Sequence, residues 1–173
     1  MFRKNNHPGF TLIELLVVIA IVGLLATISI VSLGSMRAKA RDAKRVADMR
    51  QLRTALEMYY LERGDYPSQQ ITLSEESSSY NAPFCLQAST VGFAYKPCNT
   101  ASGTIFMAAV PMPPSPADGS CKAMNDYGFD DGISKNYYYY IKGTNTYTIQ
   151  FCLGSSVGGL AAGFHTSTPS GIQ

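Results

Sequence analysis

The residues of this sequence that could do the most distinctive chemistry are its four cysteines, all after residue 64. They could bind zinc or form disulfides. Zinc is disfavoured, because there is no C-x-x-C pair and His165 is the only histidine in that region. An even count favours two disulfides if the region lies outside the cytoplasm. Three connectivities are possible for Cys85, Cys98, Cys121 and Cys152, and we expect nearest pairing, Cys85–Cys98 with Cys121–Cys152.

A second group of candidate residues is a short acidic cluster in residues 125–132. Asp126, Asp130 and Asp131 could offer oxygen ligands to calcium. Their spacing is not that of an EF-hand loop, and an exposed turn is the favoured interpretation. We therefore expect no cofactor, with calcium as the alternative.

The sequence contains no constellation that is typical of an enzyme. No Ser-His-Asp arrangement with supporting spacing and no glycine-rich phosphate loop occurs. We expect His165 to be exposed in a C-terminal tail, and we expect the chain to lack catalytic activity. The net charge of +2 gives no reason to predict nucleic-acid binding.

Glu14 directly precedes seventeen residues, 15–31, that are mostly apolar and contain no charge. Residues 10–35 as a helix would be about 39 Å long, enough for a hydrocarbon core of about 30 Å. A membrane helix is favoured over a secretory signal, because the run continues into a charged helical pattern without a good cleavage site. A carboxylate in such a helix either lies near the membrane surface or needs a cation, such as an amino group formed by cleavage upstream.

The stretch GFTLIELLVVI at residues 9–19 resembles the amino-terminal signature of type IV pilins and type II secretion pseudopilins. Residues 56–60 and 64–67 resemble the family pattern at the end of the same helix. The resemblance implies that a prepilin peptidase removes residues 1–9 by cutting between Gly9 and Phe10. It also implies that Phe10 becomes an N-methylated amino terminus and that Glu14 pairs with the amino terminus of a neighbouring subunit.

Residues 36–63 predict an amphipathic continuation of this helix. They contain no Gly or Pro, and the helix should end at Gly64. The predicted stripe consists of Ala40, Ala43, Ala47, Met49, Leu52, Leu56 and Tyr59. The basic side chains in this segment are interleaved with acids, so we interpret them as a solvated or subunit-facing surface and not as a DNA-binding face. Gly23, Thr27, Ser29 and Gly34 are points where the helix could bend.

Residues 64–173 are expected to form a disulfide-bonded head outside the cytoplasm. Residues 137–141 and 147–151 predict a β-hairpin with turn residues at 143–145, and residues 104–110 predict a strand or short buried segment. We expect residues 68–82 to be a connecting loop and residues 153–173 to be a loop or frayed tail. The predicted fold is α+β, with a small antiparallel sheet packed on the long helix.

The sequence therefore predicts a structural subunit of a type IV pilus-like filament. Its expected partners are copies of itself and related pilins, the prepilin peptidase, a membrane assembly platform and, before assembly, membrane lipid. Residues 154–159 lack the acids of the calcium loop of major pseudopilins, and no Asp-Pro-Trp occurs near residues 111–116. These departures favour a pilin over a secretion pseudopilin, which is the first alternative. The second alternative is a single-span binding protein that does not polymerise.

Overall fold

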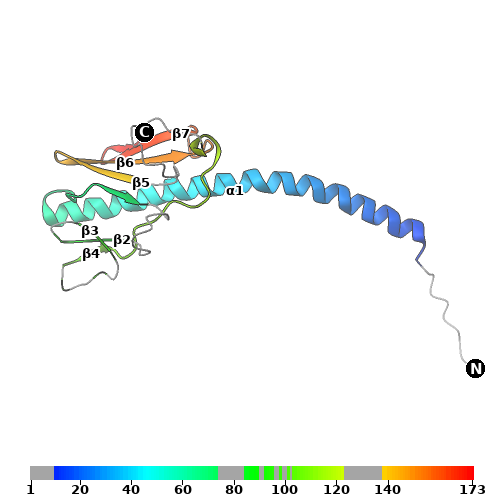
Figure 1. Cartoon of the computed structure of the whole chain (residues 1–173), viewed down its shortest axis with the longest axis horizontal. Coiled ribbons are helices and arrows are strands. Elements are labelled where there is room, and N and C mark those ends of the chain that lie inside the picture. The colour runs from blue at the N-terminus through cyan, green and yellow to red at the C-terminus, as the bar shows by residue number, and fades with distance from the viewer. Residues whose placement is uncertain are drawn as a thin grey trace, which may run out of the picture. The chain divides into compact units, whose positions relative to one another are not determined.

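A computed structural model describes residues 10–73, 84–89, 92–95, 98, 101, 103–122 and 138–173. The chain divides into two compact units, residues 1–37 and residues 38–173, and each is described by itself. Figure 1 labels the long helix and most of the strands, which are numbered in chain order. The acidic cluster at residues 125–132 and the glycine of the predicted cleavage site, Gly9, lie outside the described residues.

The long predicted helix is α1, Leu12–Arg63. It is helical through Gly23 and Gly34, so none of the predicted soft points interrupts it. The helix ends at Arg63, and Gly64 directly after it adopts a positive φ of 73° and donates from its amide to the carbonyl of Tyr60 at 2.8 Å. Glycine suits this left-handed position because it has no Cβ to clash with the preceding turn.

The larger sheet of the second unit is antiparallel and has five strands in the order β1-β5-β6-β7-β8. Its strands are β1 (Ile71–Leu73), β5 (Tyr138–Gly143), β6 (Thr146–Leu153), β7 (Gly163–Thr168) and β8 (Gly171–Ile172). The predicted hairpin is β5–β6, with Gly143 paired to Thr146 across a turn of two residues. Asn145 in that turn has a φ of 54°, a conformation that Asn tolerates better than most residues.

Two loop predictions in this region were wrong. The predicted tail at 153–173 contains β7 and β8, and β7 pairs with the whole second half of β6, from Ile149↔Ser167 to Leu153↔Gly163. In the predicted loop at 68–82, residues 71–73 form β1, which pairs with β5, and residues 74–82 lie outside the described residues. In both segments Gly, Ser, Thr and Gln outnumber the large apolar residues, although β1 contains Ile71 and Leu73 and β7 contains Phe164. Their local composition is that of a loop, but the unpaired edges of β5 and β6 supply hydrogen-bond partners.

The structure contains a second, three-stranded antiparallel sheet where the sequence predicted one sheet only. Its order is β3-β2-β4, with β2 (Phe84–Gln87) between β3 (Phe93–Tyr95) and β4 (Ile105–Met107). All four residues of β2 are buried, so this strand lacks the alternation of apolar and polar residues that marks a half-exposed strand. Strand β4 lies within the predicted segment 104–110.

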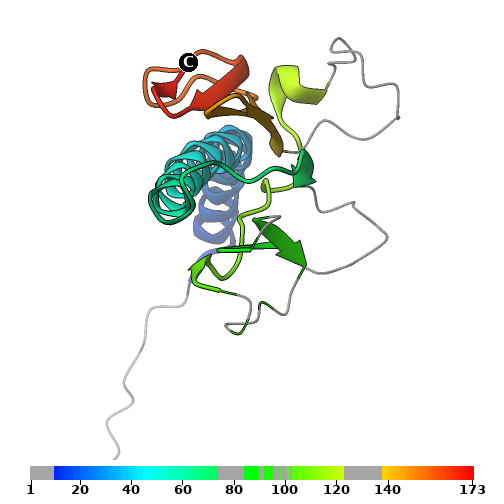
Figure 2. The same cartoon turned by 90° about the vertical axis from the view of Figure 1, so that its left-hand side faces the viewer.

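The second half of α1 lies between the two sheets, as Figure 2 shows down its length. Its buried face carries Met49, Leu52, Leu56 and Tyr59, which join one core with residues of both sheets. Tyr138, Tyr140 and Phe151 come from the larger sheet and Leu86 and Phe93 from the smaller one. The α+β fold, a long helix packed on antiparallel sheet, is therefore confirmed.

One part of the predicted helix stripe was wrong. Ala40, Ala43 and Ala47 are exposed, although they were grouped with the buried positions. The buried face of this part of the helix instead carries Asp42, Arg45 and Val46. A hydrophobic pattern cannot find that face, because two of its three members are charged.

Candidate functional site

The first candidate site is the start of α1, where Thr11 and Glu14 form a capping box. The Thr11 amide and hydroxyl both donate to Glu14 Oε2, at 2.9 and 2.6 Å, and the Glu14 amide donates to Thr11 Oγ1 at 3.3 Å. This reciprocal pattern satisfies amides that have no partner within the helix. It explains why the helix begins at Leu12 and not at Phe10, and it orients the Glu14 carboxylate at the end of the chain that cleavage would free.

The surface of α1 within the first unit is apolar and unpartnered in the single chain. Every described side chain from Phe10 to Met36 is exposed, and Glu14 is the only charged one. The helix contains a stretch with a mean hydropathy of 2.8, long and apolar enough to cross a membrane. Two of its hydroxyl groups bond within the helix itself, since Thr27 Oγ1 donates to the Leu24 carbonyl and Ser29 Oγ to that of Leu25. Such a surface is stable only in lipid or against other apolar surfaces.

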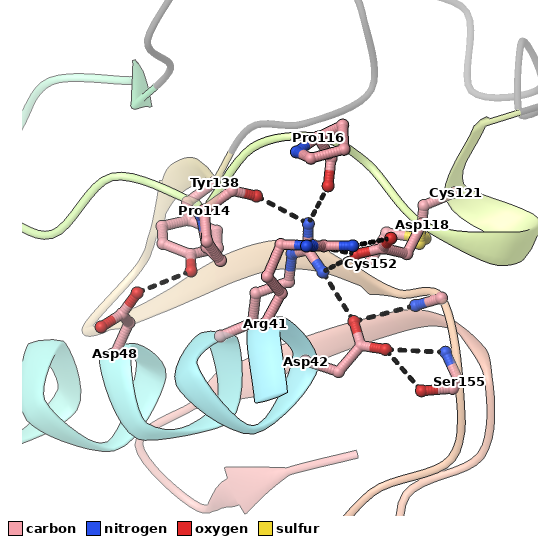
Figure 3. Close-up of polar contacts among 12 residues, drawn as sticks. Arg41, Asp42, Asp48, Pro114, Pro116, Asp118, Cys121, Tyr138, Cys152 and Ser155 are labelled. Atoms are coloured by element: carbon pink, nitrogen blue, oxygen red, sulfur yellow. Dashed lines mark hydrogen bonds and ion pairs between the residues drawn. A yellow bond between two sulfur atoms is a disulfide. The ribbon is translucent and has the colours of Figure 1, made fainter. Parts of the chain in front are cut away.

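The second unit contains a buried ionic cluster that the sequence did not predict, drawn in Figure 3. The Arg41 guanidinium donates to both carboxylate oxygens of Asp118, at 2.7 and 2.6 Å. Arg45, only 2% exposed, donates to Asp42 at 2.7 Å and lies 3.5 Å from Asp118. Two arginines and two aspartates thus neutralise each other between the helix and the segment 111–122.

Further hydrogen bonds, most of them with backbone groups, satisfy the charged side chains of this cluster. Arg45 Nη2 donates to the carbonyls of Pro114 at 2.8 Å and Pro116 at 3.2 Å. The Asp42 carboxylate accepts from the Gly154 amide at 3.1 Å, and from the Ser155 amide and hydroxyl at 2.9 and 2.7 Å. Buried charges are tolerated when they are paired and hydrogen-bonded in this way. The cluster therefore fastens two segments that are distant in sequence onto α1.

A close backbone contact and a disulfide hold the same segments together. A Cβ at Gly154 would clash with the backbone of Asp118, so glycine is required for this approach. Cys121 and Cys152 form one disulfide, next to the cluster, and Cys85 and Cys98 form the other. The structure thus contains the nearest-neighbour pairing of the four cysteines.

Carboxyl groups around the cluster have opposite pKa shifts. The hydrogen bonds from Arg41 lower the pKa of Asp118 below its ordinary value, against the effect of burial. Burial raises the pKa of Asp48, although the Tyr138 hydroxyl donates to its carboxylate at 2.9 Å and partly offsets the shift. Asp118 is therefore ionised in the native head, and the proximity of Arg41 stabilises that charge.

The expectation of an exposed tail position for His165 was wrong. His165 lies in β7 opposite Phe151 and is partly buried. Its Nδ1 lies 3.0 Å from the Gln173 carbonyl oxygen and its Nε2 lies 2.8 Å from that of Ala161. Backbone contacts thus occupy both ring nitrogens.

These features define a class of protein: a subunit with an exposed apolar amino-terminal helix and a compact, disulfide-bonded α+β head. Comparison with known proteins agrees with that class. Residues 4–30 match the family described as the prokaryotic N-terminal methylation motif, and residues 32–84 match the type II secretion system protein G family.

Individual relatives fall into two groups. The chain is 34% identical over 110 residues to the type IV wide pilus major component PilA4 of Thermus thermophilus, covering 62% of this chain and 84% of that protein. It is 41% identical over 66 residues to type II secretion system core protein G of Aeromonas hydrophila and 43% over 68 residues to that of Escherichia coli K12. These two alignments span 38% and 39% of this chain and 46% and 47% of the relatives. No solved structure matches the chain.

The chain therefore belongs to the family of type IV pilins and type II secretion pseudopilins. The family signature covers the apolar helix and the start of the head, where the sequence resemblance was found. The family models do not cover the whole ionic cluster, because Asp118 and Ser155 lie after the last matched residue, 84. The spacing of Asp42 and Arg45 in the helix indicates an i,i+3 ion pair, but no local pattern in the sequence identifies Asp118 or Ser155 as its further partners.

Proposed function

We propose that this protein is a structural subunit of a type IV pilus-like filament that polymerises through its amino-terminal helix. The observation that carries the proposal is the apolar surface of residues 12–36, whose described side chains are all exposed in the single chain. Glu14 is the only charged residue of this segment. A surface of this kind needs lipid before assembly and other subunits after it.

Assembly in this proposal is open and heterologous. One copy presents the apolar helix, and neighbouring copies present theirs at a different axial level, so that each added subunit exposes a new binding surface. A filament core of low dielectric strengthens the attraction between opposite charges, and it makes an unpaired carboxylate costly. Pairing of Glu14 with the free amino group of a neighbouring Phe10 would therefore fix the axial register.

Processing precedes assembly in this scheme. A prepilin peptidase cuts between Gly9 and Phe10, and Phe10 is N-methylated. Residues 10–35 then hold the subunit in the cytoplasmic membrane with residues 64–173 outside the cytoplasm. A membrane assembly platform extracts it, and the energy comes from a separate motor, because the sequence contains no nucleotide-binding motif.

A pilus subunit is favoured over a pseudopilin because of how far the similarity extends. The alignment with PilA4 covers 84% of that protein, whereas the alignments with core protein G cover less than half of it. The pseudopilin role in protein export remains the second candidate, since the family of core protein G matches residues 32–84. In either role we propose a structural and not a catalytic protein, which works without a bound cofactor.

The proposal is tested by comparing cells that produce the wild-type chain with cells that produce Glu14→Ala. We expect the variant to reach the membrane in normal amount while the yield of sheared filaments falls at least tenfold, because one charge of the register pair is missing. Glu62→Ala, which removes an exposed carboxylate at the other end of α1, serves as the matched control and should assemble normally. Normal filament yield from Glu14→Ala would reject the role of Glu14, and absence of the wild-type chain from any filament would favour the single-span binding protein.

A further inference from the structure

The second unit begins with an uneven distribution of charge around α1. Between Leu15 and Leu56 the sequence has seven basic residues and two acids, Asp42 and Asp48. Both acids are buried in the head, whereas Lys39, Lys44 and Arg50 are exposed. The exposed side of this helix segment therefore carries basic side chains and neither of its two acids.

The contacts of the buried groups explain this asymmetry. Arg41 and Arg45 are turned to Asp118 and Asp42, and these four charges cancel within the head. The Asp48 carboxylate accepts a hydrogen bond from the Tyr138 hydroxyl and is buried. Among the described residues from 15 to 56, no exposed carboxylate of α1 therefore offsets Lys39, and Lys44 is offset only by the buried Asp48, about one turn further along the helix.

These lysines lie close, along the chain, to the end of the apolar segment. Residues 15–36 contain no charged side chain, and as a helix they would be about 33 Å long, close to the thickness of a hydrocarbon core. Arg37 follows at once, Lys39 is three residues beyond Met36, and Lys44 is eight residues beyond it. Chain connectivity alone keeps the first two within roughly 11 Å of Met36, at headgroup level.

We propose that Lys39 and Lys44, together with Arg37, bind the headgroups of anionic phospholipids in the membrane that holds the subunit before assembly. Basic side chains directly next to a membrane helix are attracted to anionic lipid, and the attraction falls off within a Debye length of the surface. The inference rests on the membrane-anchored subunit of the proposed function. It adds anionic phospholipid as a partner. It also explains why the exposed charged side chains just after the apolar segment are basic and not acidic.

A lipid titration of the full chain tests this proposal. The protein is kept in a non-ionic detergent, phosphatidylglycerol or phosphatidylcholine is added, and bound lipids are counted by native mass spectrometry. We expect phosphatidylglycerol to bind at least about tenfold more tightly in dilute buffer, with the preference declining in high salt. In Lys39→Gln/Lys44→Gln the apparent Kd for phosphatidylglycerol should rise about 25-fold, or about fivefold for each lysine, with phosphatidylcholine unaffected.

The matched control is Arg50→Gln/Arg63→Gln, which removes the same charge from exposed positions farther along α1. It should change the apparent Kd less than threefold. Equal binding of both lipids to the wild type, or an unchanged preference in the lysine variant, would overturn the proposal. Loss of filaments with an unchanged lipid preference would also overturn it, by assigning the lysines to a contact with a neighbouring subunit. A wild-type chain that prefers phosphatidylglycerol but never enters a filament would reject the proposed function and leave this inference standing.

Discussion

Thr11 and Glu14 bond to each other in both directions at the start of α1, and this relationship gives Glu14 a partner within its own chain. The Thr11 hydroxyl donates to the carboxylate at 2.6 Å, and the Glu14 amide donates back to that hydroxyl. The carboxylate is therefore hydrogen-bonded before any neighbour arrives. Exchange of this local bond for an amino group of another subunit would let Glu14 stay partnered both in the membrane and in the filament.

The first prediction concerns that capping box. Thr11→Val removes the hydroxyl while keeping the shape of the side chain, and the first turn of α1 should lose about 1 kcal/mol. Amide hydrogen exchange of residues 13–15, measured by NMR in detergent micelles, should accelerate about fivefold. Thr27→Val is the matched control, because its hydroxyl only donates to the Leu24 carbonyl inside the helix. Equal exchange rates at residues 13–15 in wild type and Thr11→Val would show that the cap is not formed.

The second prediction concerns the buried ionic cluster. Asp118→Asn leaves Arg41 and the buried Arg45 with one carboxylate between them, and the free energy of unfolding should fall by about 3 kcal/mol. Urea unfolding of the full chain in detergent measures the change. Asp65→Asn breaks the more exposed ion pair with Lys142 and should cost less than about 1 kcal/mol. Comparable losses in the two variants would contradict a special role for the cluster.

The third prediction is the pH dependence that follows from Asp118. Its pKa is lowered in the folded head, so its contribution to stability is fully present above the ordinary aspartate pKa of about 3.9 and is lost as the pH falls through the lowered value. The stability difference between wild type and Asp118→Asn should be constant from pH 7 to pH 5 and shrink below about pH 4. Asp48 acts with the opposite sign, because burial raises its pKa. A difference that grows on acidification would contradict the ion pair.

The fourth prediction compares the two disulfides. Cys121–Cys152 closes the longer interval, 31 residues against 13 for Cys85–Cys98. Chain entropy then predicts losses of about 4 and about 3 kcal/mol when each pair is replaced by alanine. We expect the measured difference between the two losses in free energy of unfolding to be larger, because the Cys121–Cys152 disulfide also fixes the segment that contains Asp118. Urea unfolding of the two double variants checks the order, and a costlier loss for Cys85–Cys98 would contradict it.

The local features of the chain could be predicted from the sequence because each depends on a short pattern. The long uncharged run and Gly64 indicate what α1 is exposed to and where it ends. Its start was predicted two residues too early, at Phe10, because the Thr11–Glu14 capping box was not part of the prediction. The β5–β6 hairpin follows from aromatic and β-branched residues on both sides of a short turn. The four cysteines are in one region, and nearest pairing requires the shortest loops.

The features that were missed depend on residues brought together from distant parts of the chain. Arg45 appears as an ordinary basic residue in a helix until Asp118, 73 positions away, is folded against it. Strand β7 has the composition of a loop and becomes a strand because β6 offers an unpaired edge. Neither partner can be identified from local composition, so the two-sheet head and its ionic cluster were beyond prediction from a single sequence.

The amino terminus of the assembled subunit tests the central claim most directly. Filaments sheared from cells that produce this chain are purified, and the intact mass and amino-terminal peptide of their main subunit are measured by mass spectrometry. The account predicts this chain beginning at N-methylated Phe10, with residues 1–9 removed. Filaments without this chain, or a functional chain that retains Met1, would contradict it.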